Sequence, residues 1–198
     1  MVRTIARDHG EKRQHILRTA ARVFAEQGYD RASMNLVAQE CGVSKANIYH
    51  YYDSKDALLL DLLQGHLTAL RDRVAAVPLA GLEPEERLHL ILREILLAQQ
   101  GGEDEHKILL TGLALIGAEE QKALRQLQRE VVDQVSAILR DLAPESLGTD
   151  RAKLRAVTMS VFGMLNWYTM WKPNAGAGAR ETYARLVTDF ALGGVRGI

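Results

Sequence analysis

Apolar residues recur at every third or fourth position along almost the whole chain, and this spacing limits its fold more than any other feature. Ile16, Ala20, Val23 and Phe24 form one such stripe near the N-terminus. Spacings of three and four place side chains on one face of an α-helix, whereas a half-buried strand needs strict alternation. Only four prolines interrupt the 198 residues. The sequence therefore predicts an all-α protein with almost no sheet.

Glycine, proline and capping residues divide this periodic pattern into about nine expected helices. Asp8 with Glu11 resembles the start of a capped helix, Gly28 can end it, and Pro84 suits the first turn of another. The expected ranges are 8–27, 34–40, 45–52, 54–76, 84–100, 103–118, 119–142, 150–171 and 179–192. We expect an N-terminal domain over residues 1–53 and a C-terminal domain over residues 54–198.

Two short helices with a glycine turn between them are expected in residues 33–52. Ser33 suits the N-cap of the first and Ser44 that of the second, while Val43 and Ile48 occupy the two positions of a hydrophobic staple. A longer helix precedes the pair and can cover its apolar sides. This arrangement is typical of a helix-turn-helix, in which the second short helix enters the major groove of DNA.

The second short helix should divide its residues between the core and DNA. Ile48 and Tyr52 are four positions apart and should face the core, which turns their neighbours outward. An Asn side chain can bond adenine, Lys can reach guanine or phosphate, an Ala methyl can touch thymine, and Tyr or His can donate to phosphate. The expected DNA-contacting residues are Ser33, Ser44, Lys45, Ala46, Asn47, Tyr49, His50 and Lys55. Lys55 has the alternative of a plain solvated charge.

Charge and composition exclude some classes of protein without identifying one. The formal net charge is zero, which argues against a protein that coats nucleic acid. Residues 1–52 hold eight basic and five acidic residues, and this +3 excess alone would suit an ordinary surface. Cys41 is the single cysteine, so an internal disulfide and a four-thiolate zinc site are excluded. Since neither a signal peptide nor a membrane span is evident, we expect a cytoplasmic protein.

An ordered set of residues in the first third of the chain resembles a known family. The residues are Gly28-Tyr29, Ser33-Met34, Val37-Ala38, Cys41-Gly42-Val43-Ser44-Lys45, Ile48-Tyr49-His50-Tyr51-Tyr52 and Ser54-Lys55. The pattern resembles the signature of the tetracycline-repressor (TetR) family over about residues 10–62. Two departures are Ala46-Asn47 in the recognition helix, expected to change operator choice, and Tyr52 in place of a usual phenylalanine. The resemblance implies a homodimer that binds a palindromic operator and releases it when a small molecule enters the C-terminal domain.

The C-terminal domain is expected to form the dimer as well as the ligand site. Residues 150–171 carry apolar side chains on more than one face, so one face can pack in the monomer and another against a second copy. Residues 179–192 would add a second helix to this interface, giving a twofold four-helix arrangement. The alternative is one larger monomeric bundle.

Residues from Gly163 to Gly176 are similar to the corresponding segment of TetR-type regulators that respond to acyl-coenzyme A thioesters. Trp167 and Trp171 lie on one side of the helix and suit either a ligand tunnel or ordinary packing, and Lys172 could meet coenzyme A phosphates. The expected ligand-binding residues are His66, Phe162, Trp167, Trp171 and Lys172. The alternative effector is a drug or another hydrophobic compound.

Enzymatic function finds little support in the sequence. Neither a phosphate-binding loop nor a Gly-x-Ser-x-Gly motif is evident, and Gly176-Ala177-Gly178 lacks the third glycine of a dinucleotide site. We therefore expect no catalytic residues, no cofactor and no metal. The remaining alternative is a helical dimer module that does not bind DNA, which would leave the outward residues of the second short helix without a common role.

Overall fold

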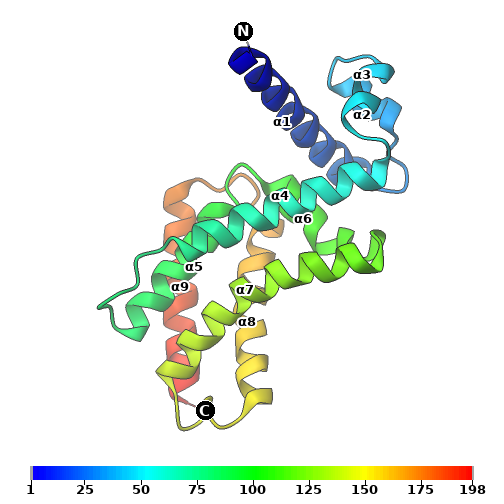
Figure 1. Cartoon of the computed structure of the whole chain (residues 1–198). Coiled ribbons are helices and arrows are strands. Elements are labelled where there is room, and N and C mark those ends of the chain that lie inside the picture. The colour runs from blue at the N-terminus through cyan, green and yellow to red at the C-terminus, as the bar shows by residue number, and fades with distance from the viewer. Residues whose placement is uncertain (1, 198) are drawn as a thin grey trace. The chain divides into compact units, whose positions relative to one another are not determined.

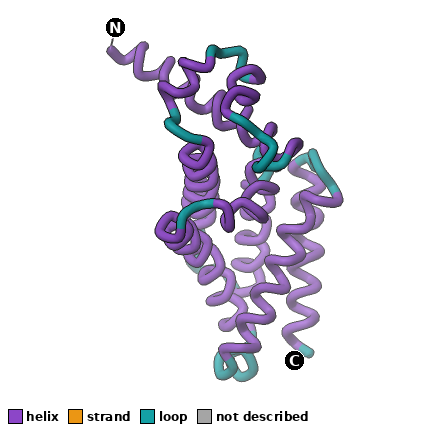
Figure 2. Tube along the Cα trace, turned by 90° about the vertical axis from the view of Figure 1, so that its right-hand side faces the viewer, coloured by secondary structure: helices purple, strands orange, loops and turns teal. Residues whose placement is uncertain are grey.

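The computed structural model describes residues 2–197, and within that range the chain is built of helices and loops without strands (Figures 1 and 2). A short 3-10 turn, Leu113–Leu115, follows the sixth helix. The α-helices are α1 (Val2–Gln27), α2 (Met34–Glu40), α3 (Lys45–Tyr51), α4 (Lys55–Ala75), α5 (Pro84–Ala98), α6 (Glu103–Gly112), α7 (Ala118–Leu142), α8 (Arg151–Trp171) and α9 (Ala177–Arg196). The predicted all-α class and the nine helices are confirmed.

Three predicted helix boundaries are wrong by four residues or more. Helix α1 begins at Val2, so Asp8 and Glu11 lie inside the helix and do not start it. Helix α9 ends at Arg196 instead of residue 192. Helix α6 ends at Gly112 instead of continuing to residue 118. A Cβ atom at Gly112 would lie 3.2 Å from Ile108 Cγ2, closer than most Cβ contacts, so glycine suits this position. These misses arise from features that periodicity does not record.

The chain divides into two compact units, neither of which is one continuous stretch. Unit 1 comprises Met1–His66 and Asp104–Leu124, and unit 2 comprises Leu67–Glu103 and Arg125–Ile198. Helices α4, α6 and α7 therefore each contribute residues to both units. The boundary expected after residue 53 separates a DNA-binding domain from a ligand-binding domain. The two units are defined by packing alone, so this boundary stays a prediction.

Unit 1 is held together by an apolar core and by a polar contact between α1 and α4. Helix α2 packs against α1 and α3, and Phe24, Val37 and Ile48 from these three helices are fully buried. Arg13 of α1 contacts the Asp61 carboxylate of α4 at 2.5 Å, and the Tyr52 hydroxyl donates to the same carboxylate at 2.5 Å. Burial, and then this hydrogen bond, raise the pKa of Tyr52, so the phenol keeps its proton at neutral pH.

Unit 2 is a helical bundle in which α5 packs along α9 and both contact α8. Its apolar core continues into α4 and α7. Pro84 occupies the first turn of α5, as predicted, with a reciprocal cap between Glu83 and Glu86. Asp150 starts α8 by accepting hydrogen bonds from two backbone N–H groups at 2.9 Å. None of the helices described is long and apolar enough to span a membrane.

Candidate nucleic-acid interface

The turn between α2 and α3 is fixed by side-chain caps and by one glycine. The Ser33 hydroxyl accepts a hydrogen bond from the Leu36 N–H at 3.2 Å, and the Ser44 hydroxyl accepts one from the Asn47 N–H at 3.2 Å. Gly42 has a φ of 66°, which a residue with a side chain rarely adopts. The two predicted N-caps are therefore confirmed, and the start of α3 is held in a defined direction.

Helix α3 presents one face to the core and the rest of its surface to solvent. Ile48 is fully buried and Tyr52, which follows the helix, is also buried. The exposed residues are Lys45, Ala46, Asn47, Tyr49 and His50. The Lys45 ammonium lies 5.9 Å from the centre of the Tyr49 ring, one turn along the helix. This exposed surface combines amide, ammonium, methyl, phenol and imidazole groups, which suits contact with base edges and phosphates.

The remaining residues expected to contact DNA already have structural partners. Ser33 and Ser44 use a hydroxyl lone pair as a cap, which leaves each O–H able to donate to a phosphate. Lys55 is half-buried and donates to the Tyr29 carbonyl at 2.7 Å and to the Ala32 carbonyl at 3.0 Å. Because an ammonium has three donors, one remains for DNA. Lys55 is thus a connection between α4 and the loop before α2, which the sequence did not predict.

His9 is a candidate residue that the sequence analysis missed. Its exposed ring lies 4.6 Å from the Tyr51 ring and 6.5 Å from the His50 ring, measured between ring centres. His9 belongs to α1, more than 40 positions before His50 and Tyr51, so no local spacing could have linked them. The contact places an additional imidazole next to the end of the predicted recognition helix.

Large apolar side chains are exposed on α8 and α9. Trp167 is 63% exposed and Phe190 is 68% exposed, values unusual for side chains of this size. The exposed apolar residues of the two helices are Met159, Trp167, Met170, Trp171, Leu186 and Phe190. Gly163 and Gly193 have open space where a side chain would project. We call these six residues the α8–α9 surface.

Comparison with known proteins identifies the family of this helix-turn-helix chain. Residues 16–62 match the family model "Bacterial regulatory proteins, tetR family", and residues 81–195 match "Tetracyclin repressor-like, C-terminal domain". The chain belongs to the tetR family of bacterial regulatory proteins. The family resemblance inferred from residues 10–62 is therefore confirmed, and this tetR-family member is a DNA-binding transcription regulator.

Solved tetR-family structures share the fold over nearly the whole chain. A TetR-family transcriptional regulator from Bordetella parapertussis 12822 has a TM-score of 0.85 and 33% sequence identity, covering 91% of this chain and 93% of that one. AibR, solved in complex with isovaleryl coenzyme A and operator DNA, has a TM-score of 0.73 and 24% identity, covering 90% and 97%. At that identity the likeness to AibR shows the fold alone.

Curated relatives match over shorter stretches. The HTH-type transcriptional regulator YuxN of Bacillus subtilis (strain 168) is 36% identical over 74 residues, which are 37% of this chain and 25% of YuxN. The match thus covers about a quarter of that relative's length, and it concerns only part of that protein.

The five residues expected to bind an effector in this tetR-family chain are divided between the two units and between core and surface. His66 belongs to unit 1, whereas the other four belong to unit 2. Phe162 is buried in the core of unit 2. The other three residues, Trp167, Trp171 and Lys172, are exposed. This exposure argues against the alternative in which the two tryptophans form the wall of an internal tunnel. Tyr168 of the same helix is also buried, and its ring stacks on Tyr183 with centres 4.2 Å apart.

His66 is the effector candidate with the most unusual surroundings. Its ring centre lies 6.0 Å from that of His106, and its Nε2 atom is buried without a hydrogen-bond partner among the described residues. Burial, and then the neighbouring His106, lower the pKa of His66 to about 4. The imidazole is therefore neutral at physiological pH and can either donate or accept. Among the described residues, no group of three or more His, Cys, Asp or Glu could hold a metal ion.

Proposed function

We propose that this tetR-family chain is a homodimeric repressor that binds a palindromic operator and releases it when a small hydrophobic effector binds. The observation that carries this proposal is the exposed surface of α3. Five of its residues are exposed and suited to DNA contact, while the buried Ile48 and the Ser44 cap hold the helix in position. A regulator of this kind acts where the bacterial chromosome lies, in the cytoplasm.

Each exposed residue of α3 has a proposed role set by its chemistry. The Asn47 amide can form two hydrogen bonds with adenine, Lys45 can donate to guanine or phosphate, and the Ala46 methyl can contact thymine. Tyr49 and His50 donate to phosphate oxygens and so set the position of α3 in the groove. Ser33, Ser44 and Lys55 add phosphate contacts with the donors that their structural hydrogen bonds leave available.

The proposed dimer forms through the α8–α9 surface. Six large apolar side chains are exposed on these two helices, and a second copy of the chain would cover them. A twofold arrangement of α8 and α9 from each copy gives a four-helix interface. Such a dimer presents two α3 helices, which matches a palindromic operator.

The proposed effector is hydrophobic, with an acyl-coenzyme A thioester as the specific candidate. The AibR complex with isovaleryl coenzyme A supports this class, since AibR shares the fold. Within unit 2, Phe162 is proposed to contact the apolar part of the effector and the exposed Lys172 to lie toward its coenzyme A end. Effector binding then favours a dimer whose α3 helices no longer match successive major grooves.

A mobility-shift assay tests DNA binding on the DNA upstream of the chain's own coding sequence. At low salt the wild-type protein should retard this DNA, and Tyr49→Ala should weaken binding because a phosphate contact is lost. Lys122→Ala, at an exposed position of α7, serves as the control for loss of a side chain outside α3. Failure of the wild type to retard the DNA, or equal effects of the two substitutions, would contradict the proposal.

A further inference from the structure

The carboxamide of Gln99 is buried without any hydrogen-bond partner in the described part of the chain. Gln99 is the residue that ends α5, and only 1% of it is exposed. Neither its Oε1 nor its Nε2 atom has a partner among the described residues. Buried side-chain polar groups are almost always hydrogen-bonded to protein or water, since leaving one without a partner is destabilising. Among the described residues, this amide therefore lacks the partners that a buried polar group usually has.

The backbone groups near Gln99 are already engaged. The Leu96 carbonyl accepts hydrogen bonds from the Gln99 N–H at 3.3 Å and from Arg180 Nη1 at 3.1 Å. The Leu97 carbonyl accepts from the Gln100 N–H at 3.1 Å. The Gln99 carbonyl itself accepts from the Gly102 N–H at 3.1 Å. The backbone of this turn is thus largely satisfied, and the side-chain amide is the polar group left over.

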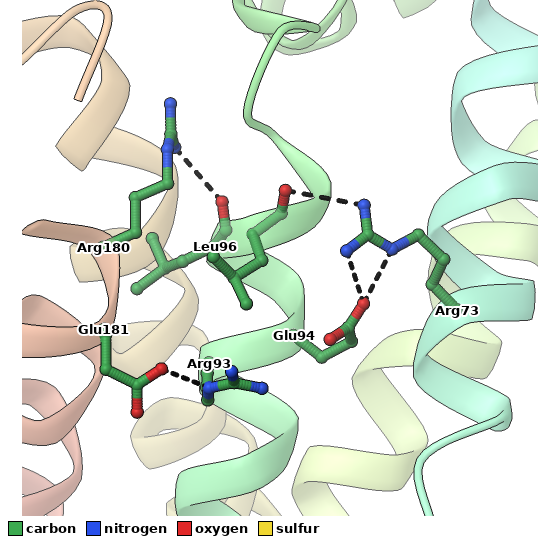
Figure 3. Close-up of polar contacts among 7 residues, drawn as sticks. Arg73, Arg93, Glu94, Leu96, Arg180 and Glu181 are labelled. Atoms are coloured by element: carbon green, nitrogen blue, oxygen red, sulfur yellow. Dashed lines mark hydrogen bonds and ion pairs between the residues drawn. The ribbon is translucent and has the colours of Figure 1, made fainter. Parts of the chain in front are cut away.

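Two arginines hold the end of α5 from opposite sides (Figure 3). Arg180 of α9 is fully buried, and it donates to the Ala175 carbonyl at 2.9 Å and contacts Glu103 at 2.5 Å. Arg73 of α4 contacts Glu94 at 2.6 Å and donates to the Leu97 carbonyl at 3.5 Å. These contacts restrain the turn that carries Gln99, which favours an amide kept inside the unit over one that turns out to solvent.

The two arginines at the end of α5 are already engaged in ion pairs. Arg180 is paired with Glu103, and Arg73 is paired with Glu94. An anionic ligand group would therefore have to compete with a carboxylate for either arginine. A carboxamide offers one oxygen acceptor and two N–H donors, so its best complement is a neutral group that both donates and accepts.

We propose that Gln99 is the polar anchor of the effector site and binds a secondary amide or a hydroxyl group of the effector. The inference rests on the proposed function and narrows the chemistry of its ligand. The arm of a coenzyme A thioester contains both kinds of group, whereas a plain hydrocarbon compound contains neither. Binding supplies the two hydrogen bonds that the folded chain lacks, so the free energy of effector binding includes relief of this buried amide.

Thermal unfolding of the full-length protein without ligand provides the first test. Gln99→Met keeps the length of the side chain and removes the amide, so it should raise the unfolding midpoint by about 3 °C. Gln100→Leu at the exposed neighbouring position should leave the midpoint within about 1 °C. A fall of the midpoint in Gln99→Met would show that the amide has a structural partner such as an ordered water, and it would overturn the proposal.

Binding of two matched pairs of small probes provides the second test. Isothermal titration calorimetry would compare N-hexylacetamide with N-hexyl-N-methylacetamide, which lacks the N–H, and 1-heptanol with 1-methoxyhexane, which lacks the O–H. The wild type should bind the donor-bearing member of at least one pair about 10-fold more tightly, and Gln99→Met should lose that preference. The pair that shows the preference distinguishes an amide from a hydroxyl. Absence of any preference, or its persistence in Gln99→Met, would overturn the proposal.

DNA retardation separates this inference from the proposed function. Gln99→Met should still retard the upstream DNA, because Gln99 lies outside the unit that carries α3. A wild type that binds the probes selectively but not DNA would contradict the repressor and leave Gln99 as a binding residue. A wild type that binds DNA but lacks the probe preference would contradict the role of Gln99 alone.

Discussion

The His66 imidazole gives the clearest pH-dependent contribution of a single residue. The ordinary pKa of 6.5 applies in the unfolded chain, while burial and then His106 lower it to about 4 in the folded chain. Between these values the unfolded chain binds a proton that the folded chain does not. The contribution of His66 to the free energy of unfolding is fully present above pH 6.5. It is lost as the pH falls from 6.5 toward 4, by about 1.4 kcal/mol for each pH unit.

His66→Gln should remove this contribution. Urea unfolding at pH 7.5, 6.0 and 5.0, at one fixed protein concentration, should show a flatter fall in the free energy of unfolding for His66→Gln than for the wild type. His50→Gln, at an exposed position of α3, serves as the control. A wild type and a His66→Gln variant with parallel pH profiles would show that His66 is not held neutral by burial.

Single residues were predictable from sequence where their partners are local. Ser33 and Ser44 each cap an N–H three positions later, so the pattern alone located both. Lys55 contacts carbonyls 26 and 23 positions away, and Arg180 contacts one 84 positions away, so neither role could be predicted from spacing. Gln99 carried no signal in the sequence, because what distinguishes it is a side-chain amide without a hydrogen-bond partner among the described residues.

At the scale of elements, helices were predictable because apolar periodicity records which face is buried. The nine helices and their order followed from that pattern, whereas the short turn Leu113–Leu115 after α6 did not, since it depends on how Gly112 packs. Two buried faces could also be expected for α8, but the sequence could not say which side the tryptophans take. Trp167 and Trp171 are exposed, so neither packs in the core of the single chain.

The α8–α9 surface leads to a prediction about assembly. Phe190→Asp should weaken dimerisation by at least about 100-fold, because the loss of a buried aromatic side chain occurs twice in a twofold interface. Sedimentation velocity across a range of protein concentrations would measure the shift from dimer to monomer. Arg140→Asp, an exposed change on α7, should leave the association constant unchanged. A Phe190→Asp variant that dimerises like the wild type would place the interface elsewhere.

At the scale of the whole molecule, the proposed function requires an α3 that reads DNA and a C-terminal domain that dimerises and binds an effector. The family membership of both parts is established by the matches over residues 16–62 and 81–195. The sequence indicated the DNA end well because its caps and turn are local. The five residues expected at the effector end stay a prediction; they are divided between the two units and between core and surface, and an internal site depends on long-range packing that spacing does not record.

Footprinting of the DNA upstream of the chain's own coding sequence tests the central claim most directly. The account predicts one protected site with twofold symmetry, whose half-sites lie about 34 Å apart or a multiple of that distance, and a loss of protection with Asn47→Ala at the same protein concentration. Uniform protection without a symmetric site, or an unchanged footprint with Asn47→Ala, would contradict the claim that α3 reads the operator.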